Sequence, residues 1–501
     1  MPSISEVKKH DNANDCWVIV NNKIYDVTEF LPEHPGGQKI ILKFAGKDCT
    51  KKFEQIHPPD TLDKYLAPEK YLGEVEQNSD EEDEGEEEEE EELDEEEKQR
   101  LELIERKPPL SQIYNLNDFE YVASKVMEKQ AWAYYSSGCD DEITLRENHF
   151  AYQRIFFKPR VLRNVTNIDF STEILGFKSS VPFYVTATAL GKLGHPDGEK
   201  CLTRACFKEN VIQMVPTLSS CSFQEIVDER NKEKDQTQFF QLYVNSDRKI
   251  TQKIVENCEK NNIKALFITV DAPQLGRREK DMRSKYTLDA SNIQNDVEED
   301  EGIDRSQGAA RAISSFIDTG LNWEDIKWFK KITKLPIILK GIQCVDDALL
   351  AIEYGVEGIV LSNHGGRQLE FARSSIEVLA DLMPILKQKK LDKKIEIFID
   401  GGVRRASDIL KAIALGAKGV GIGRPFLYAM SAYGDDGVVK AMRILKDELT
   451  MNMRLLGVNT VGELNENYLD LLNLHNRFSS GDQLFQQVYE PLKLPAFKPK
   501  L

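Results

Sequence analysis

The chain has 501 residues, of which 41% are hydrophobic and 9% aromatic, a composition typical of globular protein and a length that favours two domains. Its formal net charge of -18 disfavours nucleic acid as a partner. No apolar run approaches the roughly 18 residues of a membrane helix, so we expect no membrane anchor. The eight cysteines include no Cys-x-x-Cys pair, which predicts reduced core residues and no zinc site.

Residues 1–76 are predicted to form a small α+β domain. The stretch CWVIVNNKIYDVT alternates like a hairpin that turns at Asn21-Asn22, and the later part has helical spacing broken by glycine and proline. This later part, EHPGGQKIILKFAGKDCTKKFEQIH, resembles the haem-binding core of cytochrome b5 domains. The resemblance implies that His34 and His57 are the two axial ligands of haem b. Iron ligated in this way has no open position, so the domain would carry single electrons.

Residues 77–107 are predicted to be an acidic linker. Between Asp80 and Glu97 almost every residue is a carboxylate. Such a block repels itself and cannot bury apolar surface, so we expect it to be disordered and extended. We interpret it as a spacer between two domains; attraction of a basic protein partner is the alternative.

Residues 108–475 are predicted to form an α/β domain, because apolar strand-like runs alternate with helical patterns. The runs cover 181–188, 211–217, 237–244, 265–273, 335–341, 358–363, 395–402 and 418–423. Eight such runs favour a closed (β/α)8 TIM barrel. Residues 476–501 would form a tail outside this barrel.

The carboxyl ends of these runs carry polar and charged residues, and barrels place their active sites at that face. After the seventh and eighth runs, DGGVRR and GIGRPFLYA each open a helix. Glycines let backbone N–H groups approach a ligand and helix N-termini favour anions, so these loops predict a phosphate site with Arg404 and Arg424 as cations. Lys340 could form a Schiff base or place a fixed charge beside a cofactor. An electron-carrying first domain favours the second reading, with a phosphate-bearing flavin as the cofactor.

Several motifs resemble those of the FMN-dependent α-hydroxy-acid oxidases and dehydrogenases over residues 110–475. They are KQAWAYYSSGCDDEITLREN, FYVTATALGKLGHPDGE, QLYVNSDR, TVDAPQLGRREKDM, SNHGGRQLE and FIDGGVRR. The resemblance implies oxidation of a 2-hydroxy acid to a 2-oxo acid, with His364 as the general base and Asp271 hydrogen-bonded to it. It also implies substrate-binding roles, in which Arg367, Tyr134 and Arg278 hold the carboxylate and Tyr243 contacts the hydroxyl.

The same resemblance implies the residues that hold FMN. Those near the isoalloxazine would be Thr188, Ala189, Thr217, Gln241, Thr269, Lys340 and Ser362, and those near the ribityl and phosphate groups Asp400, Gly401, Gly402, Arg404, Gly423 and Arg424. Ala189 would donate its backbone N–H to the reactive nitrogen of the flavin. Where the family usually has a serine that contacts the flavin, this chain has Pro216 followed by Thr217, and Thr217 would replace that serine.

Ala189 and Leu218 are small and medium apolar residues that suit a methyl side chain, so we expect L-lactate as the substrate. With the haem domain in front, the resemblance implies transfer of single electrons to haem b and then to cytochrome c, in a homotetramer contacted by the C-terminal tail. An oxygen-using oxidase that forms hydrogen peroxide, and a haem carrier on an inactive barrel, are the alternatives. The residues do not distinguish hydride transfer from initial removal of the carbon-bound proton.

The N-terminal residues show neither a signal-peptide core nor the character of a transit peptide. We therefore expect a cytoplasmic protein, or one of the mitochondrial intermembrane space if the sequence is a mature form. The ending Pro499-Lys500-Leu501 only distantly resembles a peroxisomal Ser-Lys-Leu signal.

Overall fold

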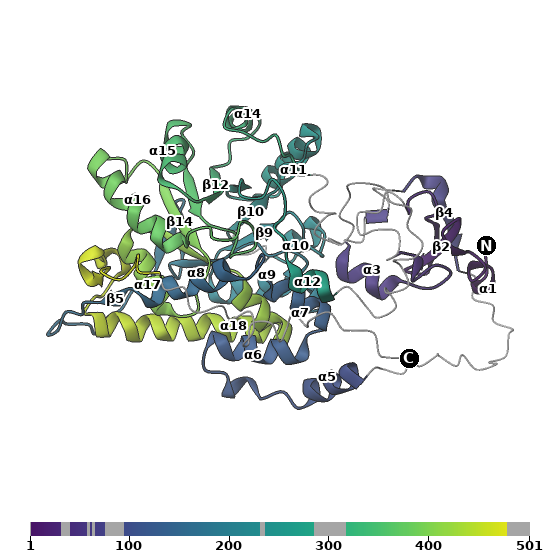
Figure 1. Cartoon of the computed structure of the whole chain (residues 1–501), viewed down its shortest axis with the longest axis horizontal. Coiled ribbons are helices and arrows are strands. Elements are labelled where there is room, and N and C mark those ends of the chain that lie inside the picture. The colour runs from purple at the N-terminus through teal and green to yellow at the C-terminus, as the bar shows by residue number, and fades with distance from the viewer. Residues whose placement is uncertain are drawn as a thin grey trace.

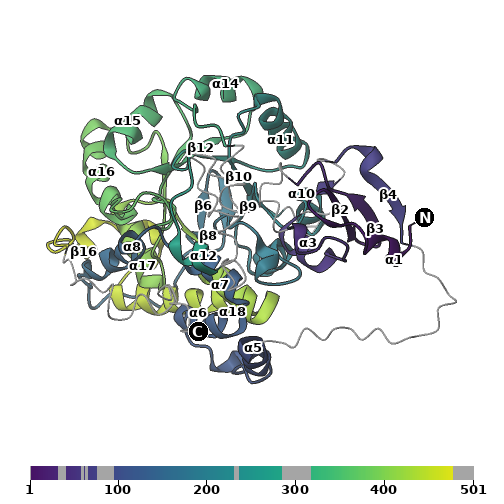
Figure 2. The ribbon, with the colours of Figure 1, turned by 45° about the vertical axis from the view of Figure 1, so that its right-hand side comes forward.

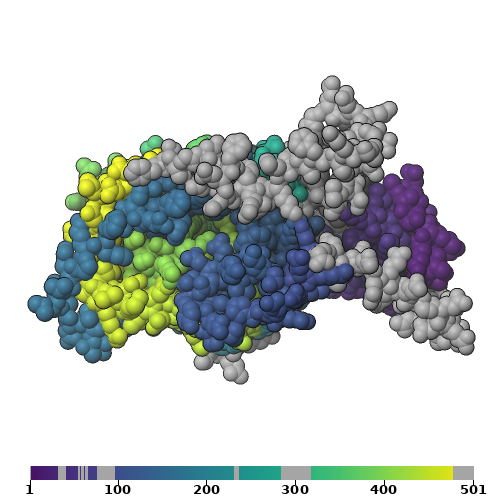
Figure 3. Space-filling model, turned by 60° about the horizontal axis from the view of Figure 1, so that its bottom comes forward, coloured from purple at the N-terminus to yellow at the C-terminus, as the bar shows by residue number. Residues whose placement is uncertain are grey.

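The computed structural model describes residues 2–31, 41–57, 61–62, 66–75, 95–230, 236–284 and 317–477 (Figure 1). His34 and residues 478–501 of the predicted tail lie outside this described part. A small N-terminal domain and a large barrel domain lie side by side, and the space-filling view places the small domain at one end of the molecule (Figure 3).

The small domain contains an antiparallel sheet of four strands in the order β1-β2-β3-β4. The strands are β1 Asp11–Asn12, β2 Asp15–Val20, β3 Lys23–Asp26 and β4 Tyr71–Glu74, with the helices α1 Ile4–Val7, α3 Thr50–Ile56 and η1 Pro68–Lys70. The predicted hairpin is confirmed. Asn21 and Asn22 have φ of +51° and +63°, the left-handed values that a tight two-residue turn between β2 and β3 requires and that asparagine tolerates.

The described end of the predicted acidic linker is helical, so the prediction of a disordered segment is wrong for these residues. Helix α5 covers Glu95–Glu105 and contacts α6, Leu116–Val126. Here the sequence changes from carboxylates alone to a mixture with Lys, Arg, Leu and Ile. Arg100 donates to Glu97 one turn earlier and to the carbonyl oxygen of Val126 at 2.8 Å, and Ile104 packs against the barrel domain's core. This helix therefore belongs to the barrel domain.

The large domain is a closed parallel barrel, as predicted, and each predicted run coincides with one of its strands, with β12 ending one residue beyond its run (Figure 2). The strands are β8 Phe183–Val185, β9 Gln213–Pro216, β10 Gln238–Leu242, β11 Leu266–Thr269, β12 Ile337–Ile342, β13 Gly358–Leu361, β14 Glu396–Asp400 and β15 Gly419–Ile422. β15 pairs with β8 and closes the barrel. All strands are parallel, so their carboxyl ends meet at one face.

Helices surround this barrel (Figures 1 and 2). Those between or after the strands are α9 Glu199–Glu209, α10 Phe223–Asp228, α11 Arg248–Lys260, α12 Glu279–Ser284, α14 Asp325–Ile332, α15 Val345–Glu353, α16 Ser375–Lys389, α17 Ala406–Leu415 and α18 Arg424–Leu456. Before the barrel come α7 Lys129–Ser136 and α8 Ile143–Gln153. The short elements are β5 Phe156–Phe157, β16 Leu469–Asp470, β6 Thr172–Ile174, β7 Phe177–Ser179, η2 Leu110–Gln112, η3 Gly191–Leu193, η6 Val461–Glu463 and η7 Glu466–Tyr468.

Large apolar side chains fill the inside of the barrel, so it is a packed core and not a pore. They include Tyr184, Met214, Phe239, Phe267 and Phe398, all almost fully buried. The hairpin of β6 and β7 packs Ile174 and Phe177 against this cluster, where the backbone N–H of Leu175 donates to Glu396 at the start of β14. This end of the barrel is therefore closed, which leaves the carboxyl-end face for a site.

None of the helices within the described ranges is long and apolar enough to cross a membrane. The eight cysteines are all free, as predicted, and six of them are buried. Cys344 is exposed, so the prediction of a core position is wrong for this residue, which directly precedes α15 at the surface.

The two domains meet at helix α3 of the small domain, which contacts η3 of the barrel domain. Lys52 of α3 forms an ion pair of 3.2 Å with Glu128, which precedes α7. Arg100 lowers the pKa of Glu97, and Lys51 and Lys52 contribute to this effect. Acidic groups of the barrel domain thus face basic groups of α3.

Candidate functional site

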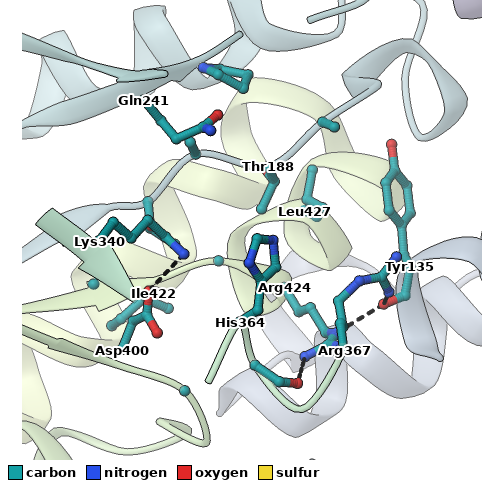
Figure 4. A pocket seen from close by; sticks show the side chains of 18 of the residues that line it. Tyr135, Thr188, Gln241, Lys340, His364, Arg367, Asp400, Ile422, Arg424 and Leu427 are labelled. Carbon is teal, nitrogen blue, oxygen red and sulfur yellow. Dashed lines mark hydrogen bonds and ion pairs between the residues drawn. The ribbon is translucent and has the colours of Figure 1, made fainter. Parts of the chain in front are cut away.

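A cavity opens at the carboxyl ends of the barrel strands (Figure 4). Most residues that the sequence assigned to a site line it, namely Tyr134, Thr188, Ala189, Leu218, Gln241, Tyr243, Thr269, Arg278, Lys340, His364, Arg367, Asp400, Gly401, Gly402, Arg404, Gly423 and Arg424. They are far apart in the sequence and come together because the parallel strands all end at this face. Asp271, Thr217 and Ser362 lie directly behind this lining, as their contacts below show.

His364 follows β13 in a turn of left-handed backbone. Its φ is +60°, and those of Gly365 and Gly366 are +65° and +74°. A Cβ on Gly366 would lie 2.5 Å from the backbone of Leu145 in α8, so only glycine fits this close approach. The turn is thereby pressed against α8, and the imidazole of His364 points into the cavity (Figure 4).

The two ring nitrogens of His364 have different partners. Nδ1 lies 2.9 Å from Oδ1 of Asp271, and Nε2 lies 3.2 Å from the hydroxyl oxygen of Tyr243. Burial acts to raise the pKa of Asp271, but His364 and Lys340 together hold it below its usual value, so this carboxylate is ionised. A carboxylate only accepts hydrogen bonds, so Nδ1 carries the proton and Nε2 is an acceptor.

Electrostatics keep this imidazole neutral and the phenol protonated. Burial lowers the pKa of His364 and outweighs Asp271, which acts to raise it. Burial and the nearby Asp271 raise the pKa of Tyr243. His364 can therefore accept a proton at Nε2 near neutral pH, and Asp271 would stabilise the resulting imidazolium.

Three arginines around the cavity have no carboxylate to neutralise them: within the described ranges, Arg278, Arg367 and Arg424 form no ion pair. Burial lowers the pKa of Arg278 to about 10 and that of Arg424 to about 10, and in both cases the charge of Arg367 adds to the effect. Buried cations without counter-charges are costly, so this set favours anionic ligands such as carboxylate and phosphate.

Each arginine is oriented by its surroundings. Arg367 donates through Nη1 to the carbonyl oxygens of Tyr134 and Ser137, at 2.7 and 2.9 Å, and its guanidinium lies 5.1 Å from the centre of the Tyr134 ring. In the described structure its Nε and Nη2 have no hydrogen-bond partner. Arg424 donates to the carbonyl oxygens of Tyr135, Ser137 and Gly365, at 2.8 to 2.9 Å. Arg424 therefore braces the turn after His364 in addition to its predicted phosphate contact.

The other side of the cavity has the polar groups that a flavin mononucleotide would need. Lys340 is buried, with Nζ 3.5 Å from the hydroxyl of Ser362 and 3.8 Å from Oδ2 of Asp400 (Figure 4). Oδ1 of Asp400 is buried and has no partner in the part of the chain that the structure describes, so it is available to accept from a ligand hydroxyl. A Cβ on Gly402 would lie 2.0 Å from the carbonyl oxygen of Asn148, so the loop after β14 passes closely over α8.

Thr217 does not line the cavity, unlike most of the other residues predicted to hold the cofactor. Its hydroxyl donates to the carbonyl oxygen of Gln241 at 2.5 Å, and its N–H donates to the side chain of the same residue at 3.2 Å. The amide of Gln241 in turn donates to Thr269 at 2.9 Å. Thr217 therefore orients Gln241 from behind the cavity, while Pro216 itself lines it.

Sequence reasoning missed several lining residues, namely Tyr135, Thr186, Ala187, Leu275, Gly365, Val403, Gly421, Ile422, Pro425 and Leu427. Most are apolar or small and sit next to predicted residues, so adjacency to the strand ends was the available signal. Leu275 and Leu427 have no such signal, because they reach the cavity only through the packing of the loop after β11 and of α18.

In the small domain, the predicted haem ligand His57 directly follows α3, which ends at Ile56. Its ring is partly buried and lies 4.9 Å from the ring of Phe53. The second predicted ligand, His34, lies outside the described residues.

Another group of potential metal ligands, His195, Asp197 and Cys201, lies beside the barrel. The guanidinium of Arg204 already occupies this place, with Nη2 2.7 Å from Asp197 and 3.5 Å from the sulfur of Cys201. Burial raises the pKa of the Cys201 thiol. These side chains form a hydrogen-bonded cluster around the guanidinium of Arg204.

Comparison with protein families identifies the family of each domain. The model described as FMN-dependent dehydrogenase matches residues 123–471, which is most of the chain. The chain belongs to this family. The model described as cytochrome b5-like heme/steroid binding domain matches residues 3–76. The barrel is therefore an FMN-dependent dehydrogenase domain, and the small domain is of the haem-binding cytochrome b5 type. Both resemblances noted in the sequence are confirmed.

Two relatives match the chain over nearly its whole length, and a third matches a shorter part of it. The chain is 57% identical to an L-lactate dehydrogenase (cytochrome) of Wickerhamomyces anomalus over 499 residues, covering 98% of this chain and 84% of the relative. It is 52% identical to the enzyme of the same name from Saccharomyces cerevisiae over 501 residues, covering 99% and 84%. A peroxisomal (S)-2-hydroxyacid oxidase of Arabidopsis thaliana is 40% identical over 361 residues, 72% of this chain and 97% of the oxidase.

Among solved structures, a mutant flavocytochrome b2 with pyruvate bound superimposes with a TM-score of 0.70. It is 53% identical and covers 80% of this chain and 98% of that chain. A mandelate oxidase structure has a TM-score of 0.62 at 33% identity and covers 72% of this FMN-dependent dehydrogenase and 98% of that chain.

Proposed function

We propose that this FMN-dependent dehydrogenase oxidises L-lactate to pyruvate and passes the electrons singly to haem b and then to cytochrome c. The observation that carries the proposal is the neutral His364, held between Asp271 and Tyr243 and facing arginines without carboxylate partners. A 2-hydroxy acid has a hydroxyl group and a carboxylate group. This arrangement has a base for the hydroxyl proton and cations for the carboxylate. The names of the relatives from Wickerhamomyces anomalus and Saccharomyces cerevisiae agree with this substrate.

The substrate carboxylate would bind to the unpaired Nε and Nη2 of Arg367 and to Arg278. A planar guanidinium matches two carboxylate oxygens, which orients the substrate as well as binding it. The hydroxyl group would then lie between Tyr243 and Nε2 of His364. His364 takes up a proton, and Asp271 stabilises the imidazolium. The same residues serve a mechanism in which the hydroxyl proton leaves with a hydride and one in which the carbon-bound proton leaves first.

FMN, when bound, supplies the acceptor for the two electrons of the hydroxy acid, and haem b carries them onward one at a time. Lys340 would place its charge at the pyrimidine edge of the flavin. Asp400 and the glycine loops after β14 and β15 would hold its ribityl and phosphate groups, with Arg404 beside them. His34 and His57 would ligate the haem iron. Helix α3, which His57 directly follows, contacts η3, and η3 begins two residues beyond Ala189, which brings the two cofactor-binding units together.

The side chain of the substrate would face Ala189 and Leu218, which line the cavity. These residues leave room for a methyl group, so L-lactate should be preferred to long or aromatic 2-hydroxy acids. A comparison of kcat/KM for L-lactate, glycolate and L-mandelate tests this choice, and lactate in last place would overturn it.

A homotetramer forms part of the proposal, with the tail 476–501 as one contact. Exposed apolar side chains support self-association: Phe156 is 63% exposed, Val161 81% and Leu472 84%. Phe156 belongs to β5, and Leu472 follows β16 by two residues. These two strands pair with each other at the end of the molecule opposite the small domain (Figure 1). Analytical ultracentrifugation of the whole chain distinguishes a tetramer from a monomer.

An oxygen-using 2-hydroxy-acid oxidase is the second candidate, because the barrel is also 40% identical to a peroxisomal oxidase. Anaerobic stopped-flow spectroscopy with L-lactate separates the possibilities. Flavin bleaching, followed by haem reduction and then by reduction of added cytochrome c, supports the proposal. Peroxide formation in air at the rate of lactate turnover supports the oxidase. Failure of lactate to bleach the flavin would refute both and favour a haem carrier on an inactive barrel.

The compartment also belongs to the proposal. We propose the cytoplasm, or the mitochondrial intermembrane space if the sequence is a mature form, and cell fractionation with an antibody to the chain tests this.

A further inference from the structure

We propose that Glu199 is a positioning residue that joins the two loops which select the side chain of the substrate. The inference rests on the proposed function, which places Ala189 and Leu218 against that side chain. Glu199 itself does not line the cavity. It is the first residue of α9, and its side chain turns back towards the loops that follow β8 and β9.

One buried carboxylate bridges the two loops. Glu199 is 0% exposed. Its Oε1 accepts from the backbone N–H of Gly191 at 2.8 Å and from that of Ser220 at 3.0 Å, and its Oε2 accepts from the N–H of Cys221 at 3.1 Å. Gly191 comes two residues after Ala189, and Ser220 comes two residues after Leu218. The carboxylate therefore holds together the backbone directly behind both selecting residues.

Further hydrogen bonds join the same loops. The N–H of Leu190 donates to the carbonyl oxygen of Leu218 at 3.0 Å, and the N–H of Lys192 donates to the hydroxyl of Ser220 at 3.2 Å. The hydroxyl of Tyr135 donates to the carbonyl oxygen of Leu190. Both polar groups of Leu190 are thus satisfied, one by the neighbouring loop and one by α7.

The loop after β8 needs such support because its backbone is strained. Leu190 has a φ of +59°, a left-handed value that costs energy for a residue with a β-carbon. A Cβ on Gly191 would lie 2.9 Å from the carboxyl carbon of Glu199, so the carboxylate lies directly against the backbone. Without Glu199, the loop that carries Ala189 would relax towards an ordinary conformation.

The negative charge of Glu199 has no cationic partner among the described residues, in which it forms no ion pair. Three backbone N–H groups donate hydrogen bonds to it. An isolated buried charge is unfavourable, and a carboxylate is nevertheless suited to this place because it can accept three bonds and needs to donate none. A glutamine would offer one oxygen and would turn its NH2 group towards an N–H donor.

The test compares Glu199→Gln with a matched control at the other end of α9. Glu209 is also buried, at 8% exposed, and pairs with Arg443 at 2.7 Å and Lys446 at 2.8 Å, but it contacts neither loop. Glu209→Gln should therefore destabilise the fold without moving Ala189 or Leu218. Glu199→Asp keeps the charge on a side chain one methylene shorter and is the second variant.

Flavin reduction by L-lactate and by L-mandelate is measured anaerobically in the full-length enzyme, per bound FMN. A small displacement of groups near the reacting atoms slows the reaction strongly. Glu199→Gln should therefore lower kcat/KM for lactate about 10- to 100-fold, mainly through kcat. It should also lower the ratio of kcat/KM for lactate to kcat/KM for mandelate about tenfold. Glu199→Asp should give intermediate values. Glu209→Gln should lower Tm and keep the ratio of the wild type.

An unchanged ratio in Glu199→Gln, or an equal change of the ratio in Glu209→Gln, would overturn the inference. If Glu199→Gln does not fold, Glu199→Asp decides, since an unaltered ratio there overturns it as well. These results require a wild type that lactate reduces. A wild type that lactate does not reduce would refute the proposed function itself, and with it the role of Glu199.

Discussion

The pairing of His364 with Asp271 predicts how far the reaction rate should fall when Asp271 loses its charge. Asp271→Asn keeps the shape of the side chain but replaces the ionised oxygen that lies 2.9 Å from Nδ1 of His364. The carboxylate stabilises the imidazolium more than it stabilises the neutral ring. The loss of this charge at about 4 Å between charge centres costs about 4 kcal/mol at an effective dielectric constant of about 20. Since about 1.4 kcal/mol is a factor of ten, kcat should fall about 100- to 1,000-fold.

The pH dependence of the same variant follows from the sign of each effect. His364 must be neutral to accept a proton, so activity is present above its pKa and is lost as the pH falls through it. Burial lowers this pKa, and Asp271 acts to raise it. Without the negative charge, the pKa of His364 should fall further. The acidic limb of the kcat/KM profile should therefore move to lower pH, while the plateau is reduced.

The assay is anaerobic flavin reduction by L-lactate from about pH 5 to pH 9, over which an imidazole titrates. Asp318→Asn is the control, since Asp318 pairs with Arg248 of α11 at 2.5 Å and does not line the cavity. A fall in rate of less than about threefold, which is under 1 kcal/mol, would refute the assigned role of Asp271. So would an acidic limb that moves to higher pH.

Three further predictions concern the carboxylate clamp, the cofactor loop and the haem domain. Arg367→Lys loses the planar fork, so KM for lactate should rise about 10- to 100-fold in steady-state assays, while an unchanged KM would contradict the clamp. Gly402→Ala puts a Cβ 2.0 Å from the carbonyl oxygen of Asn148, at a residue whose φ is +78°. This change should lower the free energy of unfolding, measured with urea, by about 2 kcal/mol or more and should weaken FMN binding. A variant as stable as the wild type would argue against this close approach. His57→Ala should abolish the haem absorption bands and cytochrome c reduction but leave flavin reduction by lactate within about twofold, because the barrel has its own core and site. Loss of flavin reduction in this variant would contradict the division of labour between the domains.

The contact between the domains is made of exposed groups. Lys52 and Glu128 retain 47% and 38% of their side-chain exposure, so their ion pair contributes at most about 1 kcal/mol and is weakened by salt. Among the described residues, α3 also contacts η3 of the barrel domain. This same η3 is fixed from inside by Glu199, so the surface that α3 contacts is anchored to the catalytic loops.

The sequence by itself determined the class of fold and the positions of the polar strand ends, because both depend on local patterns. A buried parallel strand is a continuous apolar run, and eight such runs between helical segments have few arrangements other than a closed barrel. The residues after each run, from Thr188 to Arg424, could then be assigned to one face. The turn at Asn21-Asn22 was predictable for a similar reason, since its conformation is a property of two adjacent residues.

Only the tertiary structure decided which partner each polar group has. The distance between Asp271 and His364, the contact of Thr217 with the back of Gln241, and the use of Arg424 to brace the turn after His364 all join segments far apart in the chain. The acidic composition around α5 predicted disorder, but the segment is helical because it packs against α6. Glu199 had no signal in the sequence, because its role depends on three N–H groups that become neighbours only when two loops fold over one helix end. Local patterns specify secondary structure and its order, whereas hydrogen-bond partners and charge balance depend on packing between distant segments.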